Sequence, residues 1–147
     1  MNRKVLITAI DSFTGKHLSL FLKKHGYEVY GTSLIDSSKK VYKCDITLKE
    51  KITEVIKDIK PDYLIHLAGI SFVVHSDKND FYRVNSIGAI NILDAFINAK
   101  HYPRKIIMVS SASVYGNQEV ETLDESLCCK PTNHYGASKL SMEHLSH

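Results

Sequence analysis

Short apolar runs alternate along the chain with segments whose apolar residues recur every third or fourth position. The second spacing places apolar side chains on one face of a helix, whereas near-continuous runs are typical of strands covered on both faces. The pattern predicts strands at 4–9, 27–32, 41–44, 63–67 and 105–110. It predicts helices at 13–25, 47–59, 77–100 and 133–147, the third of which begins at Asp77 or Asn79.

Individual residues mark several of the helix ends. Gly26 stands directly after the first predicted helix, where a glycine commonly ends a helix. Thr47, with Glu50 three residues later, predicts a capping box at the start of the second helix. We expect one face of the first helix to carry Leu18, Phe21 and Leu22.

Strands separated by helices favour a parallel sheet with right-handed crossovers. We therefore predict an α/β fold with a doubly wound parallel sheet of Rossmann type, formed by residues 1–147 as one domain. In such folds the ligand binds beyond the carboxyl ends of the strands. Candidate residues gather at those ends, in the segment 8–15 and at Thr32, Ser33, Asp45, Ala68, Gly69, Ser110 and Ser111.

Composition and charge exclude several classes of protein. Hydrophobic residues make up 44% and charged residues 24% of the 147 positions, which is ordinary for a globular domain. The formal charge of +3 is small, and basic residues form only short pairs such as Lys39 and Lys40, so no nucleic-acid partner is expected. The apolar run at 5–10 is too short for a signal peptide or a membrane span, so no membrane partner is expected.

Cysteine and histidine positions bear on compartment and metal binding. The three cysteines include the adjacent pair Cys128 and Cys129, which does not suggest a disulfide framework and favours a reducing cytoplasm. The cysteines are too few and too badly spaced for a zinc site. His144 and His147 lie one helical turn apart without an evident third ligand, so we expect no metal site.

Five motifs follow one another along the chain: TAIDSFTG at 8–15, CDI at 44–46, HLAG at 66–69, YRVNSIGAINIL at 82–93, and VSSASVYG at 109–116 followed by YGASK at 135–139. In this order they resemble the N-terminal part of the extended short-chain dehydrogenase/reductases, the NAD-dependent epimerase/dehydratase family that acts on nucleotide sugars. The resemblance covers about residues 5–143. It implies NAD(P) as coenzyme and a nucleotide sugar as substrate.

The resemblance also implies a catalytic set. Tyr135 and Lys139 are four residues apart on a predicted helix and so share a face. A tyrosine hydroxyl ordinarily has a pKa of about 10, and a neighbouring ammonium lowers it enough for proton transfer. Ser111 matches the family residue that hydrogen-bonds the reacting oxygen, and Asn85 matches the asparagine that supports the active-site lysine or its water. The plainer alternative is that Tyr135 and Lys139 are an exposed helical pair.

A departure from the family pattern narrows the reaction. Family dehydratases resemble STDEVYG, with an acid and base pair after the threonine, but this chain has Ala112 and Ser113 there. Neither side chain is a general acid or base, so elimination of water is disfavoured. A 4-keto reductase, equivalent to a 4-dehydrogenase, is therefore expected, with a 4-epimerase as the alternative. The segment 75–93 is similar to GDP-4-keto-6-deoxymannose reductases.

The coenzyme cradle is altered. The family pattern resembles T-G-x-x-G-x-x-G, and alignment on Thr8 puts its glycine positions at Ala9, Ser12 and Gly15. If Ala9 is left-handed, the strain is about 1–2 kcal/mol. Ser12 adds bulk, although its hydroxyl could donate to a phosphate, and Asp11 repels an anion. A combined loss of roughly 1–3 kcal/mol would weaken coenzyme binding about tenfold to a hundredfold, so the cradle is degraded or specialised.

The residue at the end of the second strand indicates whether the coenzyme is NAD or NADP, because an acid there would bind the ribose 2′-hydroxyl of NAD. Only Thr32 and Ser33 stand there, and the lysine pair at 39–40 lies further on, which leans towards NADP. Asp45 matches the family residue at the adenine edge, or else serves as a turn or capping aspartate. The full set of expected coenzyme contacts is Ala9, Ser12, Phe13, Gly15, Thr32, Ser33, Asp45, Ile46, Leu67, Ala68, Gly69, Tyr135 and Lys139.

Chains of this family are normally about twice as long. We therefore expect an incomplete dinucleotide-binding domain, truncated after the catalytic helix, without the later strands and the substrate domain. The fifth strand would then lie at an open edge or pair with a second copy, giving a possible homodimer. A different class of function, a non-catalytic dinucleotide-binding fragment, is favoured by the substituted glycines and opposed by the intact Tyr135, Lys139, Ser111 and Asn85.

Overall fold

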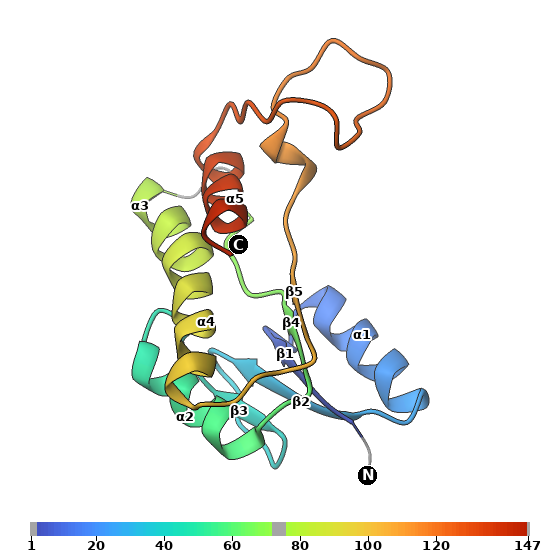
Figure 1. The fold of residues 1–147 in the computed structure, drawn as a ribbon, viewed down its shortest axis with the longest axis vertical. Helices are drawn as coiled ribbons and strands as arrows, with labels where there is room; N and C mark the ends of the chain where they lie inside the picture. Colours follow the sequence, from blue (N-terminus) through green and yellow to red (C-terminus); the bar gives the residue numbers. More distant parts are fainter. Residues whose placement is uncertain (1–2, 72–75, 147) are drawn as a thin grey trace.

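A computed structural model describes residues 3–71 and 76–146 of the chain. Its sheet has five parallel strands in the order β3-β2-β1-β4-β5, which confirms the predicted doubly wound topology (Figure 1). The strands are β1 (Lys4–Thr8), β2 (Glu28–Ser33), β3 (Val41–Lys43), β4 (Tyr63–His66) and β5 (Lys105–Met108). The helices are α1 (Phe13–Lys24), α2 (Lys49–Ile59), α3 (Lys78–Phe81), the π-helical η1 (Tyr82–Ile87), α4 (Gly88–Asn98), the 3-10 turn η2 (Ala112–Val114) and α5 (His134–Leu145).

Helices cover the sheet on both faces, as the near-continuous apolar strands require. In Figure 1, α1 lies on one side of the sheet, and α2 and α4 lie on the other. Because side chains alternate along a strand, Val5 and Ile7 of β1 belong to the cluster beneath α1, whereas Leu6 belongs to the larger cluster beneath α2 and α4. The larger cluster includes Ile52, Ile56, Leu64, Ile92 and Phe96.

The strand order reverses between β1 and β4, because β2 and β3 lie on one side of β1 and β4 and β5 on the other. β1 pairs with β2 from Lys4 opposite Glu28, and with β4 from Val5 opposite Tyr63. At such a reversal the two flanking connections leave in opposite directions and open a crevice at the carboxyl edge. β5 pairs only with β4 among the described residues and forms one edge of the sheet, as expected.

Two local predictions are wrong. Helix α2 has Leu48 at its N-cap without a side-chain cap, because the Thr47 hydroxyl and N–H both donate to Asp45 instead of forming a capping box. On α1, Leu18 and Leu22 pack against the sheet, but Phe21 is 58% exposed, its ring 4.2 Å from that of His25. Here the spacing overestimated the width of the buried face.

The long helix predicted at 77–100 is confirmed with an internal irregularity. Asp77 caps it by accepting from the N–H of Asn79, and the helical segments run without interruption to Asn98. Its six-residue π-helical section, η1, is of a type often found at functional sites. Gly26 follows α1 with a φ of +80°, as expected for a helix-ending glycine.

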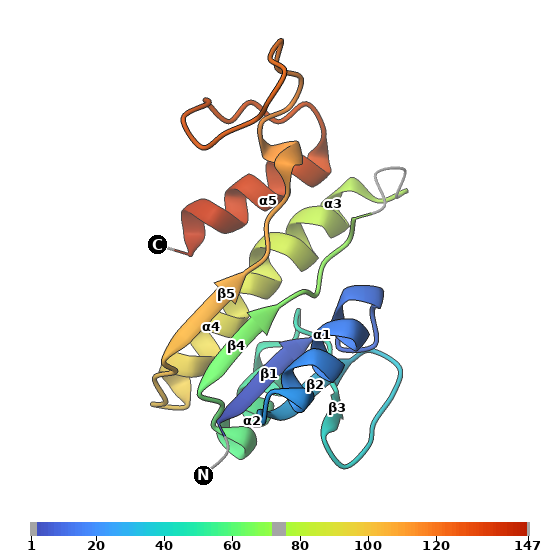
Figure 2. The same cartoon turned by 90° about the vertical axis from the view of Figure 1, so that its right-hand side faces the viewer.

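None of the helices in the described part of the chain has both the length and the apolar character that a bilayer span requires. The segment between η2 and α5 contains no helix or strand and projects beyond the carboxyl edge of the sheet (Figures 1 and 2). Helix α5 lies above α4 and beside the end of β5 (Figure 2). The β1–α1 turn, η2 and the start of α5, which contain the predicted site residues, therefore lie at the carboxyl end of the sheet.

Candidate active site

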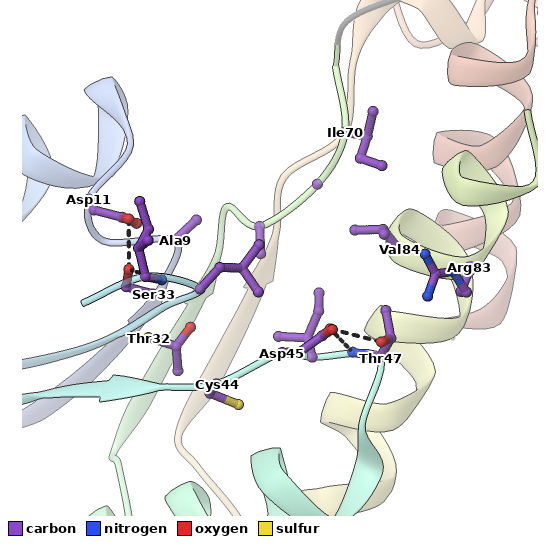
Figure 3. A pocket seen from close by; sticks show the side chains of 15 residues that line it. Ala9, Asp11, Thr32, Ser33, Cys44, Asp45, Thr47, Ile70, Arg83 and Val84 are labelled. Atoms are coloured by element: carbon purple, nitrogen blue, oxygen red, sulfur yellow. Dashed lines mark hydrogen bonds between the residues drawn. The ribbon is translucent and has the colours of Figure 1, made fainter. Parts of the chain in front are cut away.

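A cavity of about 380 Å³ opens at the carboxyl ends of the strands, at the point where the strand order reverses (Figure 3). Its walls come from the turn after β1, the end of β2, the segment after β3, the segment after β4, and η1. The expected coenzyme residues that line it are Ala9, Thr32, Ser33, Asp45, Ile46, Ala68 and Gly69. Residues outside the expected set of coenzyme contacts also line it: Asp11, Leu34, Ile35, Cys44, Thr47, Ile70, Arg83 and Val84.

The turn between β1 and α1 keeps a left-handed backbone although it has lost its first glycine. Ala9 has a φ of +51°, and the N–H of Ser12 donates to the Ala9 carbonyl over 3.0 Å. Gly15 remains necessary, because a Cβ there would lie 2.5 Å from the Ala9 carbonyl oxygen. The strain expected at Ala9 is thus present, at a cost of about 1–2 kcal/mol.

The N-terminus of α1 retains the donors that a pyrophosphate needs. Ser12 is the N-cap, and its Oγ accepts from the N–H of Gly15 over 3.1 Å while its hydroxyl hydrogen remains available. The N–H groups of Phe13 and Thr14 donate no hydrogen bond to any described residue. Free N–H groups at a helix N-terminus bind anions, so the cradle fits a dinucleotide at this position. Phe13 does not line the cavity: it is 82% exposed and lies instead in a surface depression on α1 with Thr14, His17, Leu18 and Phe21.

Asp45 stabilises a turn, one of the two roles expected for it, and it also lines the cavity. Its Oδ1 accepts from the N–H and the hydroxyl of Thr47, at 2.9 and 2.8 Å. Asn91 of α4 secures this segment by donating to the carbonyls of Ile46 and Thr47. Burial raises the pKa of the neighbouring Cys44 thiol to about 11, so this wall of the cavity carries a neutral thiol.

Lys139 is a buried lysine at the same edge. Its Nζ donates to the carbonyl of Val109, just beyond β5, over 2.7 Å. Burial lowers the pKa of Lys139, while the carboxylate of Glu143, one turn further along α5, raises it. Glu143 in turn accepts a hydrogen bond from the Ser110 hydroxyl. A Cβ on Gly69 would lie 3.7 Å from the lysine nitrogen, so Lys139 reaches the segment that lines the cavity.

Tyr135 lies one turn before Lys139 on α5 and is half-buried. Its ring packs near Phe81, with 6.4 Å between the ring centres. Its hydroxyl makes no hydrogen bond to any residue that the structure describes. Gly136 brings α5 close to η2, since a Cβ there would lie 2.4 Å from the Ser113 carbonyl oxygen. This close packing joins the Tyr135 helix to the Ser111 turn.

Ser111 is the N-cap of η2. Its Oγ accepts from the N–H of Ser113 over 3.2 Å, so the hydroxyl hydrogen remains available to a ligand. Ala112 and Ser113 form the turn itself and bring no acid or base to this wall. The site therefore offers a hydroxyl donor without a proton-transfer pair beside it.

Asn85 is fully buried in η1 and bonds to two other segments. Its side-chain oxygen accepts from the N–H of Ile70, and its side-chain nitrogen donates to the carbonyl of Ile70 and to the hydroxyl of Ser138. Its oxygen and the Lys139 nitrogen both lie near Gly69, 2.8 and 3.7 Å from the position of a Cβ there. Asn85 therefore ties the segment after β4 to α5 close to Lys139, and its support of the lysine stays a prediction.

Thr8 and His66 form a buried pair that sequence reasoning missed. The Thr8 hydroxyl accepts from the N–H groups of Leu67 and Ala68, so its own hydrogen donates to Nδ1 of His66 over 2.8 Å. This assigns the remaining hydrogen of His66 to Nε2, which has no partner among the described residues. Burial, with a smaller effect of Lys139, lowers the pKa of His66 to about 3. Leu67 therefore donates its backbone N–H to the Thr8 hydroxyl, and its side chain does not line the cavity.

The model of the NAD dependent epimerase/dehydratase family matches residues 5–147. The chain belongs to this family. Epimerase/dehydratase relatives resemble it over almost its whole length. It is 36% identical over 143 residues to a GDP-6-deoxy-D-talose 4-dehydrogenase of Aggregatibacter actinomycetemcomitans, an alignment that covers 97% of this chain and 47% of that protein.

Solved structures agree on the fold. A UDP-glucose 4-epimerase of Thermus thermophilus in complex with NAD is 26% identical with a TM-score of 0.84, covering 96% of this chain and 49% of that one. A dTDP-4-dehydrorhamnose reductase of Bacillus anthracis in complex with NADP is 29% identical with a TM-score of 0.81, covering 99% and 49%. The chain spans about half the length of the relatives it matches.

The matching family model is that of NAD-dependent epimerases and dehydratases, and the two solved neighbours are complexes with NAD and NADP. The described residues contain no group of three or more His, Cys, Asp or Glu side chains placed to hold a metal ion. Of the histidine pair considered for metal binding, His147 lies outside the described residues. The three cysteines are free.

Proposed function

We propose that the protein is an NAD(P)-dependent oxidoreductase that acts at C4 of a nucleotide-linked deoxysugar, as a 4-keto reductase or, in reverse, a 4-dehydrogenase. The observation that carries the proposal is the buried Lys139 ammonium, bound to the carbonyl of Val109 beside the segment that lines the coenzyme cavity. Burying a lysine is costly and seldom happens for fold stability alone. Its position beside Gly69, which lines the cavity, and one turn from Tyr135 on α5 supports a role in proton transfer.

In this proposal Tyr135 donates its hydroxyl proton to the carbonyl oxygen of the sugar. When bound, the reduced nicotinamide supplies a hydride to the same carbon. The oxygen thereby becomes a hydroxyl, and Tyr135 is left as a phenolate that takes a proton back from solvent. The Lys139 ammonium on the next turn stabilises this phenolate, and Glu143 helps to keep the ammonium protonated by raising its pKa.

Ser111 has the right bonding state to assist. Because its Oγ already accepts from the N–H of Ser113, its hydrogen is free to donate to the oxygen as negative charge develops. Ala112 and Ser113 cannot remove or donate a proton at neighbouring carbons, so reduction is favoured over loss of water. The similarity to a GDP-6-deoxy-D-talose 4-dehydrogenase supports the same position of attack.

The test is the substitution Tyr135→Phe, assayed by absorbance of the reduced nicotinamide with GDP-, UDP- and dTDP-linked 4-keto-6-deoxysugars. Removing the proton donor should slow hydride transfer about a hundredfold to ten-thousandfold. Coenzyme affinity should stay within about twofold, because the hydroxyl has no bond to the cradle. The matched control is Tyr102→Phe, at a tyrosine that is 80% exposed, which should keep full activity. Equal turnover in the Tyr135 variant would rule out the mechanism.

Two other functions are separated by the same assay. A 4-epimerase, the activity of the Thermus thermophilus neighbour, would convert a sugar without net change in reduced nicotinamide. A non-catalytic dinucleotide-binding fragment is favoured by the left-handed Ala9 in place of a glycine. It would bind coenzyme yet transfer no hydride to any of the sugars tested.

A further inference from the structure

We propose that Asp11, in the turn after β1, recognises the ribose 2′-hydroxyl of the coenzyme and makes the protein prefer NAD(H) to NADP(H). The inference rests on the proposed coenzyme binding and deepens it. The end of β2 itself carries Thr32 and Ser33 and no acid, a pattern that by itself favours NADP. The structure brings an acid to the same place from a different segment (Figure 3).

The turn is anchored directly onto the end of β2. The N–H of Ile10 donates to the carbonyl of Thr32 over 3.0 Å. The Ile10 side chain packs over Gly31, where a Cβ would lie 2.4 Å from its Cγ2. These contacts leave little freedom in where the next residue, Asp11, stands relative to β2.

Ser33, the last residue of β2, then binds the carboxylate. Its hydroxyl donates to Oδ2 of Asp11 over 2.7 Å and accepts from the N–H groups of Ile35 and Asp36, each at 3.1 Å. With one donated and two accepted bonds, the hydroxyl is fully used and has nothing left for a ligand. Oδ1 of Asp11 has no partner among the described residues, and Asp11 lines the cavity. A carboxylate oxygen therefore replaces the serine as the group available at the end of β2.

The nearby cations do not offset this charge. Lys40 donates to Glu28, 3.0 Å away at the opposite end of β2, roughly 16 Å along the strand from Ser33. Arg83 stands across the cavity from Asp11 and is paired with Asp80 (Figure 3). The groove behind Asp11 contains Lys23 together with the second acid Asp36. A carboxylate accepts hydrogen bonds from a ribose diol, whereas it repels a 2′-phosphate.

The experiment titrates the protein with NADH and NADPH by nicotinamide fluorescence, and with 5′-AMP and 2′,5′-ADP as competitors that carry only the adenosine end. The wild type should bind NADH about tenfold or more tightly than NADPH, and 5′-AMP should compete better than 2′,5′-ADP. Asp11→Asn should reduce the NADH preference to about threefold or less, mainly by tightening NADPH. The matched control, Asp36→Asn, removes a nearby acid whose carboxylate does not bond to Ser33 and should keep the preference.

Ser33→Ala is a second test variant, because it removes the hydrogen bond to Asp11 but keeps the Asp11 carboxylate. It should weaken the preference for NADH less than Asp11→Asn does. Equal affinity of the wild type for NADH and NADPH, or an unchanged preference in Asp11→Asn, would overturn the role of Asp11 alone. Failure of the wild type to bind either coenzyme would instead overturn the proposed function, and the selectivity with it.

Discussion

The β1–α1 turn and the α5 edge of the site depart from expectation in opposite ways. In the turn, two of three glycines of the family pattern are replaced, yet Ala9 holds the left-handed backbone and free N–H groups remain at the start of α1. At the α5 edge the family residues are all present, and they make hydrogen bonds that the motif does not specify: Asn85 bonds to Ile70 and Ser138, and Lys139 bonds to the carbonyl of Val109. The sequence motif therefore does not predict the backbone conformation of the β1–α1 turn. At the α5 edge it does not predict which hydrogen bonds the side chains make.

The difference arises from what each region packs against. The turn is compressed between Gly15 and Gly31, where any Cβ would meet Ile10 or its neighbours, so its path is set by close contacts. The α5 edge is held by hydrogen bonds from the buried side chains of Asn85, Ser138 and Lys139, which join four segments that are far apart in the sequence. A single substitution should therefore cost more at the α5 edge than in the turn.

At neutral pH the largest expected effect on stability is that of Asn85→Ala. It would leave the N–H and carbonyl of Ile70 and the hydroxyl of Ser138 without their present partner in a buried setting. We expect the free energy of unfolding to fall by about 3 kcal/mol, measured by urea denaturation. The control Asn98→Ala, at an exposed residue that ends α4, should change it by less than about 0.5 kcal/mol. An Asn85 variant as stable as the wild type would show that η1 and α5 are held together by packing alone.

The next effect is the pH dependence that His66 brings to the same edge. In the unfolded chain this imidazole takes up a proton below about pH 6.5, whereas in the folded chain burial holds its pKa at about 3. The unfolded state therefore binds more protons between these values, and stability should fall as the pH is lowered from 6.5 towards 3, by up to about 1.4 kcal/mol per unit.

Urea denaturation of the wild type and of His66→Asn across this pH range tests the prediction. The variant should lose most of the acid-dependent slope, because no group titrates at that position. His17→Gln, at an exposed histidine, should retain it. An identical slope in wild type and His66→Asn would mean that the acid sensitivity arises elsewhere.

The smallest effect is expected in the turn. Ala9→Gly relieves about 1–2 kcal/mol of left-handed strain, but about 0.4–1 kcal/mol of that gain is offset by the freer unfolded chain. The net stabilisation should be about 0–1.6 kcal/mol by the same denaturation assay. Combined with Ser12→Gly, which costs a few tenths of a kcal/mol at the N-cap, it should tighten NADH binding up to about tenfold. Unchanged binding would mean that the turn has adapted to its substitutions.

The alternation of apolar runs and helical spacing determined the elements of this protein and their parallel arrangement. It did so because burial on both faces imposes a continuous apolar pattern on each strand and a periodic one on each helix. The order of the motifs likewise placed the cradle, the Ser111 turn and the Tyr135–Lys139 helix at one edge. Capping of α2 escaped prediction, because Asp45 and Thr47 pair with each other instead of with the helix.

Only the tertiary structure decided which side chains meet. Asp11 and Ser33 are 22 residues apart, Thr8 and His66 are 58 apart, and Asn85 and Ser138 are 53 apart. Local spacing contains no information about such pairs, because they form where strand ends and a helix converge after the sheet has assembled. For this protein the sequence located the edge of the sheet at which the cavity opens, and the convergence of distant segments decided which charges and donors lie there.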